Sequence, residues 1–350
     1  MLRFLVFLNG IAAVCLLFAY LSSYVDPNTF GLLSVFGLLF PIFFILNAFF
    51  LFFWFFAKIR YSLISGLILV LSLGHVSSYF KYEKLSDVEK EKHVKNELTI
   101  ASFNVQIGGK IFNRSSKITN RNKQILEREL IEKDIDIYIL QEVNQRPKEM
   151  FTEYLPEYNK FYEKGKIQAF FSKHPILEIG EIEIGTVYNT CYWADIKLPQ
   201  ETIRVYNFHL SSNNVTKKVG KLIKQPDLSK DNTWSDINGV FKKYALASAI
   251  RVKEVRMIKE HIANSPYPVI VSGDMNDTPL SYSYRIMRKD LQDAFVTAGS
   301  GIGATYAGGV PFLRIDYTFV DPKFAIISHE IIKEDISDHY PIITTINLSE

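Results

Sequence analysis

The chain has 350 residues, and its 40 Lys and Arg against 37 Asp and Glu give a formal charge of only +3, which excludes a protein that coats nucleic acid by bulk charge. Apolar residues make up 48% and aromatic residues 14% of the sequence, which allows a large core and excludes a disordered chain. Two cysteines, Cys15 and Cys191, are too few for a disulfide framework, and both are expected to be packed thiols.

The first 80 residues differ in composition from the rest of the chain. Their only acidic or basic side chains are Arg3, Asp26, Lys58 and Arg60. Three uncharged stretches, each at or above the roughly 20 residues that a bilayer-spanning helix needs, lie at 4–25, 27–57 and 61–80. We therefore predict three transmembrane helices that anchor residues 1–80 in a lipid bilayer, with a kink at Pro41 in the second.

A cleaved signal peptide is the alternative for the first stretch, because Arg3 precedes an apolar run. No A-x-A cleavage site follows and two more apolar stretches come after it, which favours a retained anchor. Arg3, Lys58 and Arg60 flank one side of the predicted spans, so the positive-inside rule predicts a cytoplasmic N-terminus. Three crossings then put the C-terminal domain outside the cytoplasm, although Lys81 and Lys84 oppose this orientation.

Residues 81–96 are dense in Lys and Glu and are interpreted as a charged linker to a domain at 97–350. This domain opens with a predicted strand at 98–105, a helix at 120–133 and a strand at 135–140, which is an α/β pattern. Further strands without helices between them are predicted at 167–171, 176–184, 191–198 and 202–210. Such a series indicates antiparallel strands laid beside the first ones, and therefore a mixed sheet.

A Lys-rich loop at 211–236 precedes a long predicted helix at 240–264, whose apolar residues recur at helical spacing. A strand at 268–272 and a short helix at 281–289 follow. The last predicted strands lie at 314–320, 324–332 and 341–347. About 250 residues in this order suit one domain of two sheets with helices packed outside.

Several of these strands end in polar side chains, and strand ends are where binding and catalytic groups are usually mounted. The strongest case is the apolar run at 269–272, which is followed by Asp274 and Asn276; an Asx-type turn made by Asp277 is the structural alternative. Asp316 lies in an otherwise apolar strand, where a buried carboxylate needs a partner such as a histidine. Further polar groups at strand ends are Asn104, Gln141, Glu142, Asn207, His209, Asp338 and His339.

The ordered set of motifs resembles the endonuclease/exonuclease/phosphatase superfamily, which has the fold of pancreatic deoxyribonuclease. The motifs are Asn104, Gln141-Glu142, Asn207-Phe-His209, Gly273-Asp274-Met-Asn276, Arg314-Ile-Asp316-Tyr317 and Ser337-Asp338-His339. The resemblance covers about residues 97–348. It implies an α/β fold, a four-layer α/β/β/α sandwich of two mixed β-sheets, with metal-dependent phosphoester hydrolysis at one edge.

For the metal, the resemblance implies Mg²⁺ (or Mn²⁺) held by Glu142, Asn104 and Asp338, because oxygen ligands suit a hard cation. It also implies that Asp274 orients or deprotonates the attacking water. Asn276 is expected to hold a phosphate oxygen.

The resemblance places two imidazoles on the other side of the phosphate: His339, steadied by Asp316, and His209. They are expected to donate to the developing charge or to the leaving oxygen. Asn207 and Arg314 are expected to bind the substrate.

The chain departs from its relatives at two places. Gln106 stands where abasic-site repair enzymes carry an acid, which puts a second metal ligand there in doubt. The inositol-polyphosphate 5-phosphatase signature is absent, because Val271 and Arg314-Ile315 replace its Trp and Cys-Asp-Arg residues. That subclass is therefore disfavoured.

The substrate remains open at this point. A nuclease would use basic residues to follow a phosphate backbone, namely Lys217, Lys218, Lys221, Lys224, Lys242 and Lys243, although these also suit a solvated face. A phosphodiesterase acting on lipid headgroups would benefit from the membrane tether. The alternatives are a phosphomonoesterase on inositol phosphates or phospholipids, and a non-catalytic phosphate-binding module. No obligate protein partner is inferred.

Overall fold

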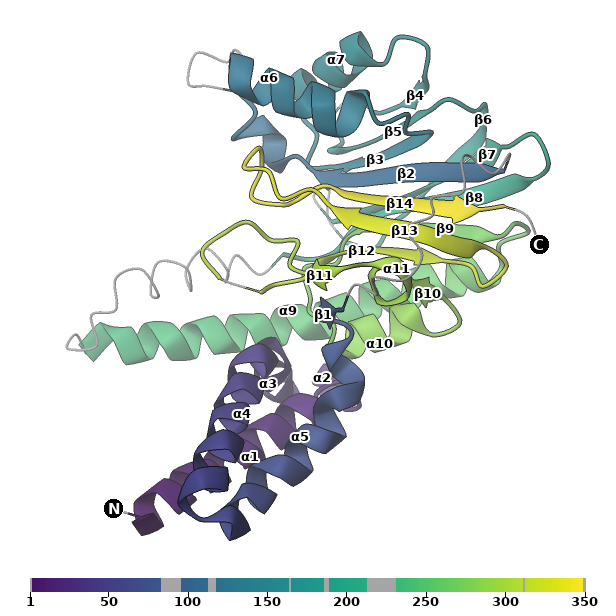
Figure 1. The fold of residues 1–350 in the computed structure, drawn as a ribbon. Helices are drawn as coiled ribbons and strands as arrows, with labels where there is room; N and C mark the ends of the chain where they lie inside the picture. Colours follow the sequence, from purple (N-terminus) through teal and green to yellow (C-terminus); the bar gives the residue numbers. More distant parts are fainter. Residues whose placement is uncertain are drawn as a thin grey trace.

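The computed structural model describes residues 2–82, 96–112, 118–163, 165–185, 189–212, 231–310 and 312–348. Figure 1 shows its layers from top to bottom: two helices, two stacked β-sheets, two further helices, and the apolar N-terminal helices. The upper helices are α6 (Asn120–Leu126) and α7 (Gln145–Tyr154), and the lower ones are α9 (Asp231–Ala263) and α10 (Tyr282–Arg288). The predicted α/β/β/α sandwich is confirmed.

The first sheet has six strands in the order β13-β14-β2-β3-β5-β4. In chain order they are β2 (Glu97–Asn104), β3 (Ile137–Gln141), β4 (Asn159–Phe161), β5 (Gln168–Ser172), β13 (Ala325–Ile331) and β14 (Ile342–Asn347). β2 and β3 are parallel and the other neighbours are antiparallel, so the sheet is mixed.

The second sheet has six strands in the order β10-β12-β9-β8-β7-β6. They are β6 (Ile176–Ile182), β7 (Thr190–Lys197), β8 (Thr202–His209), β9 (Val269–Asp274), β10 (Gln292–Asp293) and β12 (Asp316–Val320). β8 and β9 are parallel, whereas β6, β7 and β8 form the predicted antiparallel series.

Both faces of the inner strands are covered, and β3, β5, β9 and β12 are buried along their whole length. In β2, Leu98 and Ile100 point into the core between the sheets, while Ala101 and Phe103 pack under α6 and α7. On the far side of the second sheet, side chains of α9 and α10 cover β9, for example Val255 over Val269 and Val271. The two sheets are therefore held rigidly, which fixes the positions of the strand ends.

Some elements differ from the prediction. Helix α9 begins at Asp231 instead of residue 240, and the helix predicted at 120–133 consists of α6 and a π-helical turn, η3 (Glu127–Ile131). Several short elements were not predicted: α7, β4, β10, η2 (Gln106–Gly108), α11 (Ala294–Ala298), and the two-stranded ribbon of β1 (Phe80–Lys81) with β11 (Gly301–Ile302). Their apolar periodicity is too short or too weak to be read from sequence.

Within the described residues, three helices are long and apolar enough to span a membrane: Leu2–Leu21, Phe40–Ala57 and Ile59–Val76. They correspond to α1 (Leu2–Leu21), α4 (Phe40–Ala57), and η1 (Ile59–Tyr61) with α5 (Ser62–Val76). Polar groups bind the three together inside the bundle, since Ser65 Oγ lies 2.6 Å from Asn9 Oδ1 and 3.1 Å from Asn47 Oδ1. Such interhelical hydrogen bonds are typical of helices packed in lipid.

The second predicted span, at 27–57, needs correction. Only Phe40–Ala57 forms a long helix, and Pro41 lies at its start instead of kinking it. The preceding residues form two short helices, α2 (Pro27–Phe30) and α3 (Leu33–Leu38), which pack against α9. Val35 is buried against Val240 and Tyr244, so protein, and not lipid, covers this apolar segment. Composition does not distinguish these two environments.

The two-sheet sandwich therefore rests directly on the N-terminal helices. Asp26, the N-cap of α2, forms an ion pair of 2.6 Å with Arg256 of α9. Ser22 Oγ donates to the Leu280 carbonyl at 2.9 Å, and Lys81 Nζ donates to the Val296 carbonyl at 2.6 Å. Most of the linker predicted at 81–96 lies outside the described residues.

Candidate active site

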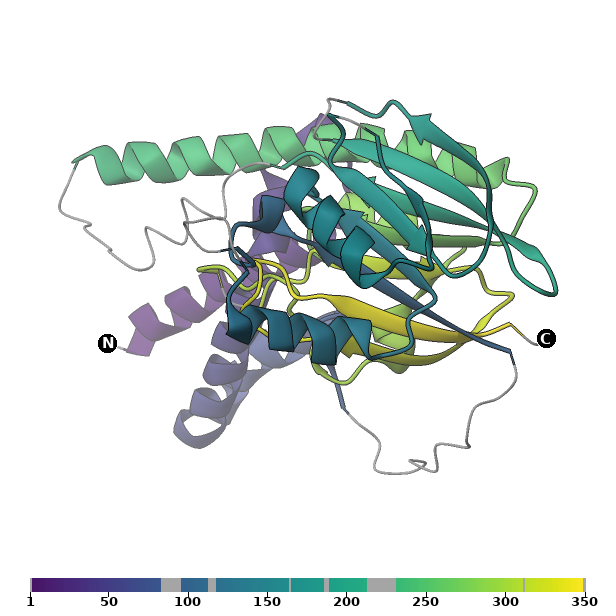
Figure 2. The same cartoon turned by 90° about the horizontal axis from the view of Figure 1, so that it is seen from above.

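The ends of five strands, from both sheets, meet at one edge of the sandwich. Asn104 ends β2, Glu142 follows β3, His209 ends β8, Asp274 ends β9, and Asp316 begins β12. Asp274 is paired in register with both His209 and Asp316. Asn104 Nδ2 joins the two sheets by donating to Asp274 Oδ2 at 3.0 Å. In Figures 1 and 2 this is the edge toward which the N-terminal half of α9 projects.

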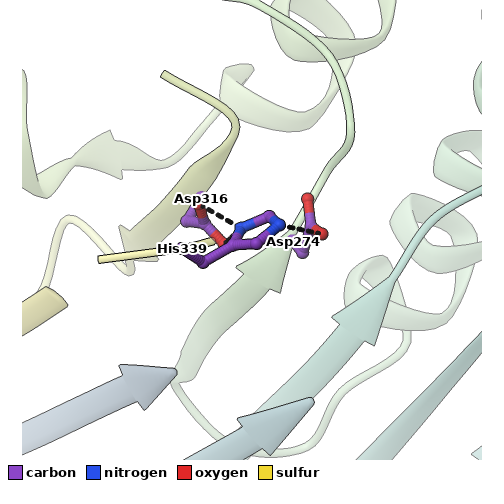
Figure 3. A group of neighbouring side chains, drawn as sticks. All are labelled: Asp274, Asp316 and His339. Atoms are coloured by element: carbon purple, nitrogen blue, oxygen red, sulfur yellow. Dashed lines mark hydrogen bonds and ion pairs between the residues drawn. The ribbon is translucent and has the colours of Figure 1, made fainter. Parts of the chain in front are cut away.

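His339 lies between two carboxylates, as Figure 3 shows. Its Nδ1 is 3.0 Å from both Oδ1 and Oδ2 of Asp316, and its Nε2 is 3.7 Å from Oδ2 of Asp274. All three side chains are buried. His339 is therefore the histidine partner that was predicted for the carboxylate of Asp316. By holding Nδ1, Asp316 orients Nε2 of the imidazole toward Asp274.

Burial and neighbouring charges shift the ionisation of this group. Burial opposes the charged imidazolium, but Asp316, Asp274 and Asp338 outweigh it and raise the pKa of His339 to about 10. Burial also raises the pKa of the Asp274 carboxyl above its usual value; His339 and His209 oppose this rise, and Asp316 adds to it. The imidazole is thus a cation at neutral pH, and Asp274 is a stronger base than an exposed carboxylate.

Asp274, Asp316 and His339 also offer ligand atoms within 4.8 Å of one another, as a metal site would. We do not assign a metal there, because the Asp316 oxygens already accept from the imidazole Nδ1 and a protonated His339 has no lone pair to give. A cationic imidazolium would also repel the metal ion.

Oxygen donors next to this group fit a hard cation better. Glu142 Oε1 lies 3.3 Å from Asn104 Nδ2, and the side chain of Glu142 is 27% exposed, so it is open to a ligand. The carboxylate of Asp338 accepts from Gln106 Nε2 at 2.7 Å. Ser337 Oγ fixes the end of β2 by donating to the Asn104 carbonyl at 2.8 Å. An all-oxygen set with excess negative charge suits Mg²⁺.

His209 has the least expected environment in the site. Both of its ring nitrogens are buried and make no hydrogen bond to any described residue. Nε2 lies 3.6 Å from Asp274 Oδ2 and 3.7 Å from Glu142 Oε1. Unpartnered buried nitrogens are costly, so an imidazole in this position is suited to a ligand that supplies the missing partner.

The backbone is strained around the site. Gln106, Glu142 and Asn276 have φ of 50°, 51° and 55°, and each follows the end of a different strand. Non-glycine residues rarely adopt such angles, and they concentrate at functional sites. Gly273 is required for a different reason: its φ is 150°, and a Cβ there would lie 2.0 Å from the Phe208 carbonyl oxygen.

The loop after β9 contains an Asx turn and is held by buried hydrogen bonds from α9. Asp274 Oδ1 accepts from the Asn276 N–H at 2.8 Å, and Asn276 Nδ2 donates to the Leu210 carbonyl at 3.1 Å. Asp277 accepts from Tyr244 Oη at 2.7 Å and from Arg251 Nε at 3.0 Å, both on α9. The same α9 also supports the loop after β8, because Glu254 accepts from the Ser211 N–H at 2.9 Å.

Two predicted site residues are not brought into this group. Asn207 has no exposed surface; its Oδ1 accepts from Gln141 at 2.9 Å, and its Nδ2 donates to the Leu140 carbonyl at 2.9 Å. Arg314 is buried in an ion pair with Asp293 and donates to the Ser78 carbonyl at 3.1 Å. The predicted role of both in substrate binding has no support in this arrangement: Asn207 joins the sheets, and Arg314 fixes the chain after α5.

Supporting residues were missing from the sequence prediction. Gln106 appeared there only as a departure, yet its amide holds Asp338. Arg251 and Glu254 were not singled out, and no local signal separates them from their exposed neighbours Lys253 and Arg256. Only the packing of α9 against the loops after β8 and β9 reveals their role.

The comparisons with known proteins agree with the fold. Residues 101–339 match the Endonuclease/Exonuclease/phosphatase family, and residues 2–79 match a domain of unknown function, DUF8431. No curated protein matches the sequence.

Solved structures resemble the sandwich at low sequence identity. An endonuclease/exonuclease/phosphatase family protein from Bacteroides thetaiotaomicron is 17% identical, with a TM-score of 0.54 over 74% of this chain and 100% of its own. TDP2 from D. rerio, complexed with a single-strand DNA product, is 19% identical, with a TM-score of 0.52 over 72% of this chain and 99% of its own. A mannosyl-6-phosphatase from Bacteroides thetaiotaomicron is 17% identical, with a TM-score of 0.51 over 71% and 99%. At these identities the likeness concerns the fold.

Proposed function

Since the chain belongs to the Endonuclease/Exonuclease/phosphatase family, we propose that it is a membrane-anchored, divalent-metal-dependent phosphoesterase that hydrolyses a phosphodiester. The observation that carries this proposal is that Nε2 of His209 and Nε2 of His339 lie 3.6 Å and 3.7 Å from Asp274 Oδ2 at one sheet edge, next to Glu142. Distant segments of the chain thus supply a base, two imidazoles and oxygen ligands, which is the equipment for attack of water on phosphorus.

Asp274 has the role of base and water-orienting group. Its Oδ1 is occupied by the Asn276 N–H, whereas Oδ2 faces Asn104 and both imidazoles. The raised pKa of this carboxyl strengthens it as an acceptor for the proton of the attacking water. Asn276 holds the carboxylate in place, because its Nδ2 donates to Asp274 Oδ2 at 3.2 Å and to the Leu210 carbonyl at 3.1 Å. Its proposed role as a donor to a phosphate oxygen requires that the phosphate replaces one of these two acceptors.

Whereas Asp274 accepts a proton, His339 has the role of a hydrogen-bond or proton donor. With a pKa of about 10 it remains protonated at neutral pH, so its Nε2–H is suited to donate to the phosphate or to the leaving oxygen. Asp316 is a positioning residue, because it holds Nδ1 and so determines where Nε2 points. The unpartnered nitrogens of His209 supply a second donor or acceptor to the same phosphate.

Glu142, Asn104 and Asp338 are the residues that would hold Mg²⁺ (or Mn²⁺). The bound ion would neutralise phosphate charge that otherwise repels the attacking oxygen. Gln106, which donates to Asp338, is a neutral support for this set.

Metal dependence can be tested directly on the full-length protein in detergent. The protein is expected to release p-nitrophenol from bis-p-nitrophenyl phosphate when Mg²⁺ or Mn²⁺ is present. This release is expected to stop when a chelator is added. Glu142→Gln is expected to raise the Mg²⁺ concentration for half-maximal rate by roughly 10-fold or more, since a charged ligand is lost. Glu149→Gln, an exposed residue on α7, is the matched control. Unchanged metal demand in Glu142→Gln would remove this residue from the metal site.

The substrate is proposed to be a phosphodiester of nucleic acid or of a lipid headgroup. Lys242 and Lys243 are exposed on α9, whereas the basic loop with Lys217, Lys218, Lys221 and Lys224 lies outside the described residues. To distinguish these two substrate classes, the protein is incubated with plasmid DNA and, in a second reaction, with phospholipid and sphingolipid vesicles. Nicking without headgroup release favours the nuclease, and the reverse favours the lipid enzyme. Turnover of inositol phosphates alone would establish the phosphomonoesterase, and no turnover would favour a binding module.

We further propose that the N-terminus is cytoplasmic and that the catalytic domain lies outside the cytoplasm. Arg3, Lys58 and Arg60 lie at the ends of the apolar helices away from the catalytic domain, while the segment from Ser22 to Leu39 contains no basic residue. Alkaline phosphatase fused after Glu350 is expected to be active in living bacteria. Inactivity of a fusion that is produced at normal levels would reverse the orientation.

A further inference from the structure

A pocket of about 500 Å³ lies where the apolar helices meet the catalytic domain. We call it the junction pocket; its wall includes Tyr24 just after α1, His75 in the last turn of α5, and Arg285, Arg288 and Lys289 at the end of α10. Figure 1 shows α10 beside the ends of the apolar helices that face the catalytic domain. The pocket is therefore at the depth where a spanning helix leaves the hydrocarbon core.

The charge on this pocket is one-sided. No Asp or Glu lines it, and in the part of the chain that the structure describes none of Arg285, Arg288 and Lys289 forms an ion pair with a carboxylate. Basic side chains in the last turn of α10 offset the negative end of the helix dipole, but that role requires no cavity. Three cations around one cavity repel one another, and a bound anion would offset this repulsion by its attraction to each of them.

Aromatic rings complete the pocket in the manner of a membrane interface. The guanidinium of Arg285 lies 4.4 Å from the ring centroid of Tyr24, and this ring lies 5.2 Å from that of Tyr20, which in turn contacts His75 at 5.4 Å. Tyrosine is enriched at the level of lipid headgroups, because one end of the ring is apolar and the other is polar.

The neighbouring helix surface provides a place for acyl chains. Within about two helical turns of the pocket along the chain, α1 exposes Leu17 and Phe18, and α5 exposes Leu71 and Leu73. A ligand with a phosphate at one end and hydrocarbon at the other would satisfy both the cations and this apolar surface. Free phosphate would satisfy only the cations.

We propose that the junction pocket binds the phosphate headgroup of an anionic phospholipid from the leaflet on the side of the catalytic domain. This inference rests on the membrane anchoring in the proposed function, but not on catalysis. The bound lipid would join α1 and α5 to α10, which follows the loop that carries Asp274 and Asn276, and so stabilise the docking of the catalytic domain on its anchor.

Native mass spectrometry of the detergent-solubilised full-length protein tests this, with phosphatidylglycerol and phosphatidylcholine added in equal amounts. The wild type is expected to retain phosphatidylglycerol preferentially. The double substitution Arg288→Gln with Lys289→Gln is expected to weaken that binding by roughly 30-fold, from the usual contribution of each cation near a lipid surface. Lys160→Gln with Lys197→Gln, which removes the same charge at exposed positions of β4 and β7, is expected to bind as the wild type does.

Three results would overturn the proposal: equal retention of both lipids by the wild type, unchanged preference in the Arg288 and Lys289 variant, or an equal loss in the control. Inorganic phosphate provides a further arm. If it raises the melting temperature as much as phosphatidylglycerol does, and no lipid is retained, the pocket is a phosphate site and the lipid assignment is wrong. Arg288→Lys, which keeps the charge, is expected to retain the preference. Because lipid mass is read out, loss of hydrolysis in an active-site variant does not affect the outcome.

Discussion

Asp274→Asn is expected to lower kcat for a phosphodiester by roughly 10²-fold to 10⁴-fold, the usual contribution of a positioned general base. Asparagine keeps the shape of the side chain and can still accept from the Asn276 N–H, but it does not take a proton from water. Asp274 is 1% exposed, so its carboxylate is shielded from solvent and no bulk water replaces it. Steady-state release of p-nitrophenol measures the loss.

The matched control is Asp321→Asn. Asp321 directly follows β12, and its backbone N–H donates to the Val269 carbonyl at the start of β9. It therefore lies at the end of β9 that is opposite to Asp274. This variant is expected to keep wild-type kcat. Comparable melting temperatures for both proteins would show that the loss in Asp274→Asn is chemical. Turnover by Asp274→Asn within about threefold of wild type would contradict the assigned role, because a general base contributes far more than that.

His339→Gln is expected to reduce kcat by roughly 10²-fold to 10³-fold, the effect of removing one preorganised donor to developing charge. The imidazolium is held between Asp316 and Asp274 and is nearly inaccessible to solvent. Glutamine offers a neutral donor without the positive charge. His174→Gln, in the turn between β5 and β6, is the control, and it is expected to be as active as the wild type. Full activity of His339→Gln would exclude this imidazole from catalysis.

Asp316→Asn tests, in the same assay of p-nitrophenol release, whether Asp316 acts by controlling the protonation of His339. Removing the carboxylate removes a cause of the raised pKa of His339, so the imidazole loses its proton at lower pH. If the protonated form is the active one, activity is present below that pKa and declines as pH rises through it. The basic limb of the pH–rate profile is therefore expected to move to lower pH. A profile unchanged in shape, with a uniform fall in rate, would indicate a structural role only.

The packing of the N-terminal helices against the sandwich bears on how the candidate site is supported. Tyr244 donates to Asp277, in the loop just after Asp274, and it also packs against Val35 of α3. Ser22, at the end of α1, donates to the Leu280 carbonyl on the same stretch of chain. The loop that carries the base is thus held on one side by β9 and on the other by the N-terminal helices. A tether through a linker alone would leave that side of the loop in solvent.

The sequence by itself determined the class of this protein. The long apolar runs before residue 81 predicted helices long enough to span a bilayer, and the order of strands and helices after residue 97 predicted two sheets with helices packed outside. Polar residues at strand ends predicted where the site would be. These signals are local: burial of a whole face imposes a pattern on consecutive residues, and the chemistry of Asp, Asn and His is visible in the residue type.

Only the tertiary structure decided how those residues meet. The apolar segment at 27–38 covers α9, and nothing in its composition distinguishes a protein surface from lipid. Asn207 and Arg314 had the same appearance in sequence as the residues that converge, yet Asn207 bonds to Gln141 and Arg314 pairs with Asp293, both away from that group. Arg251, on α9, supports the loop although it lies 26 residues before Asp277 in the chain. Such partners are set by the packing of helices against sheets, which depends on the shape of the whole core and leaves no mark on neighbouring residues.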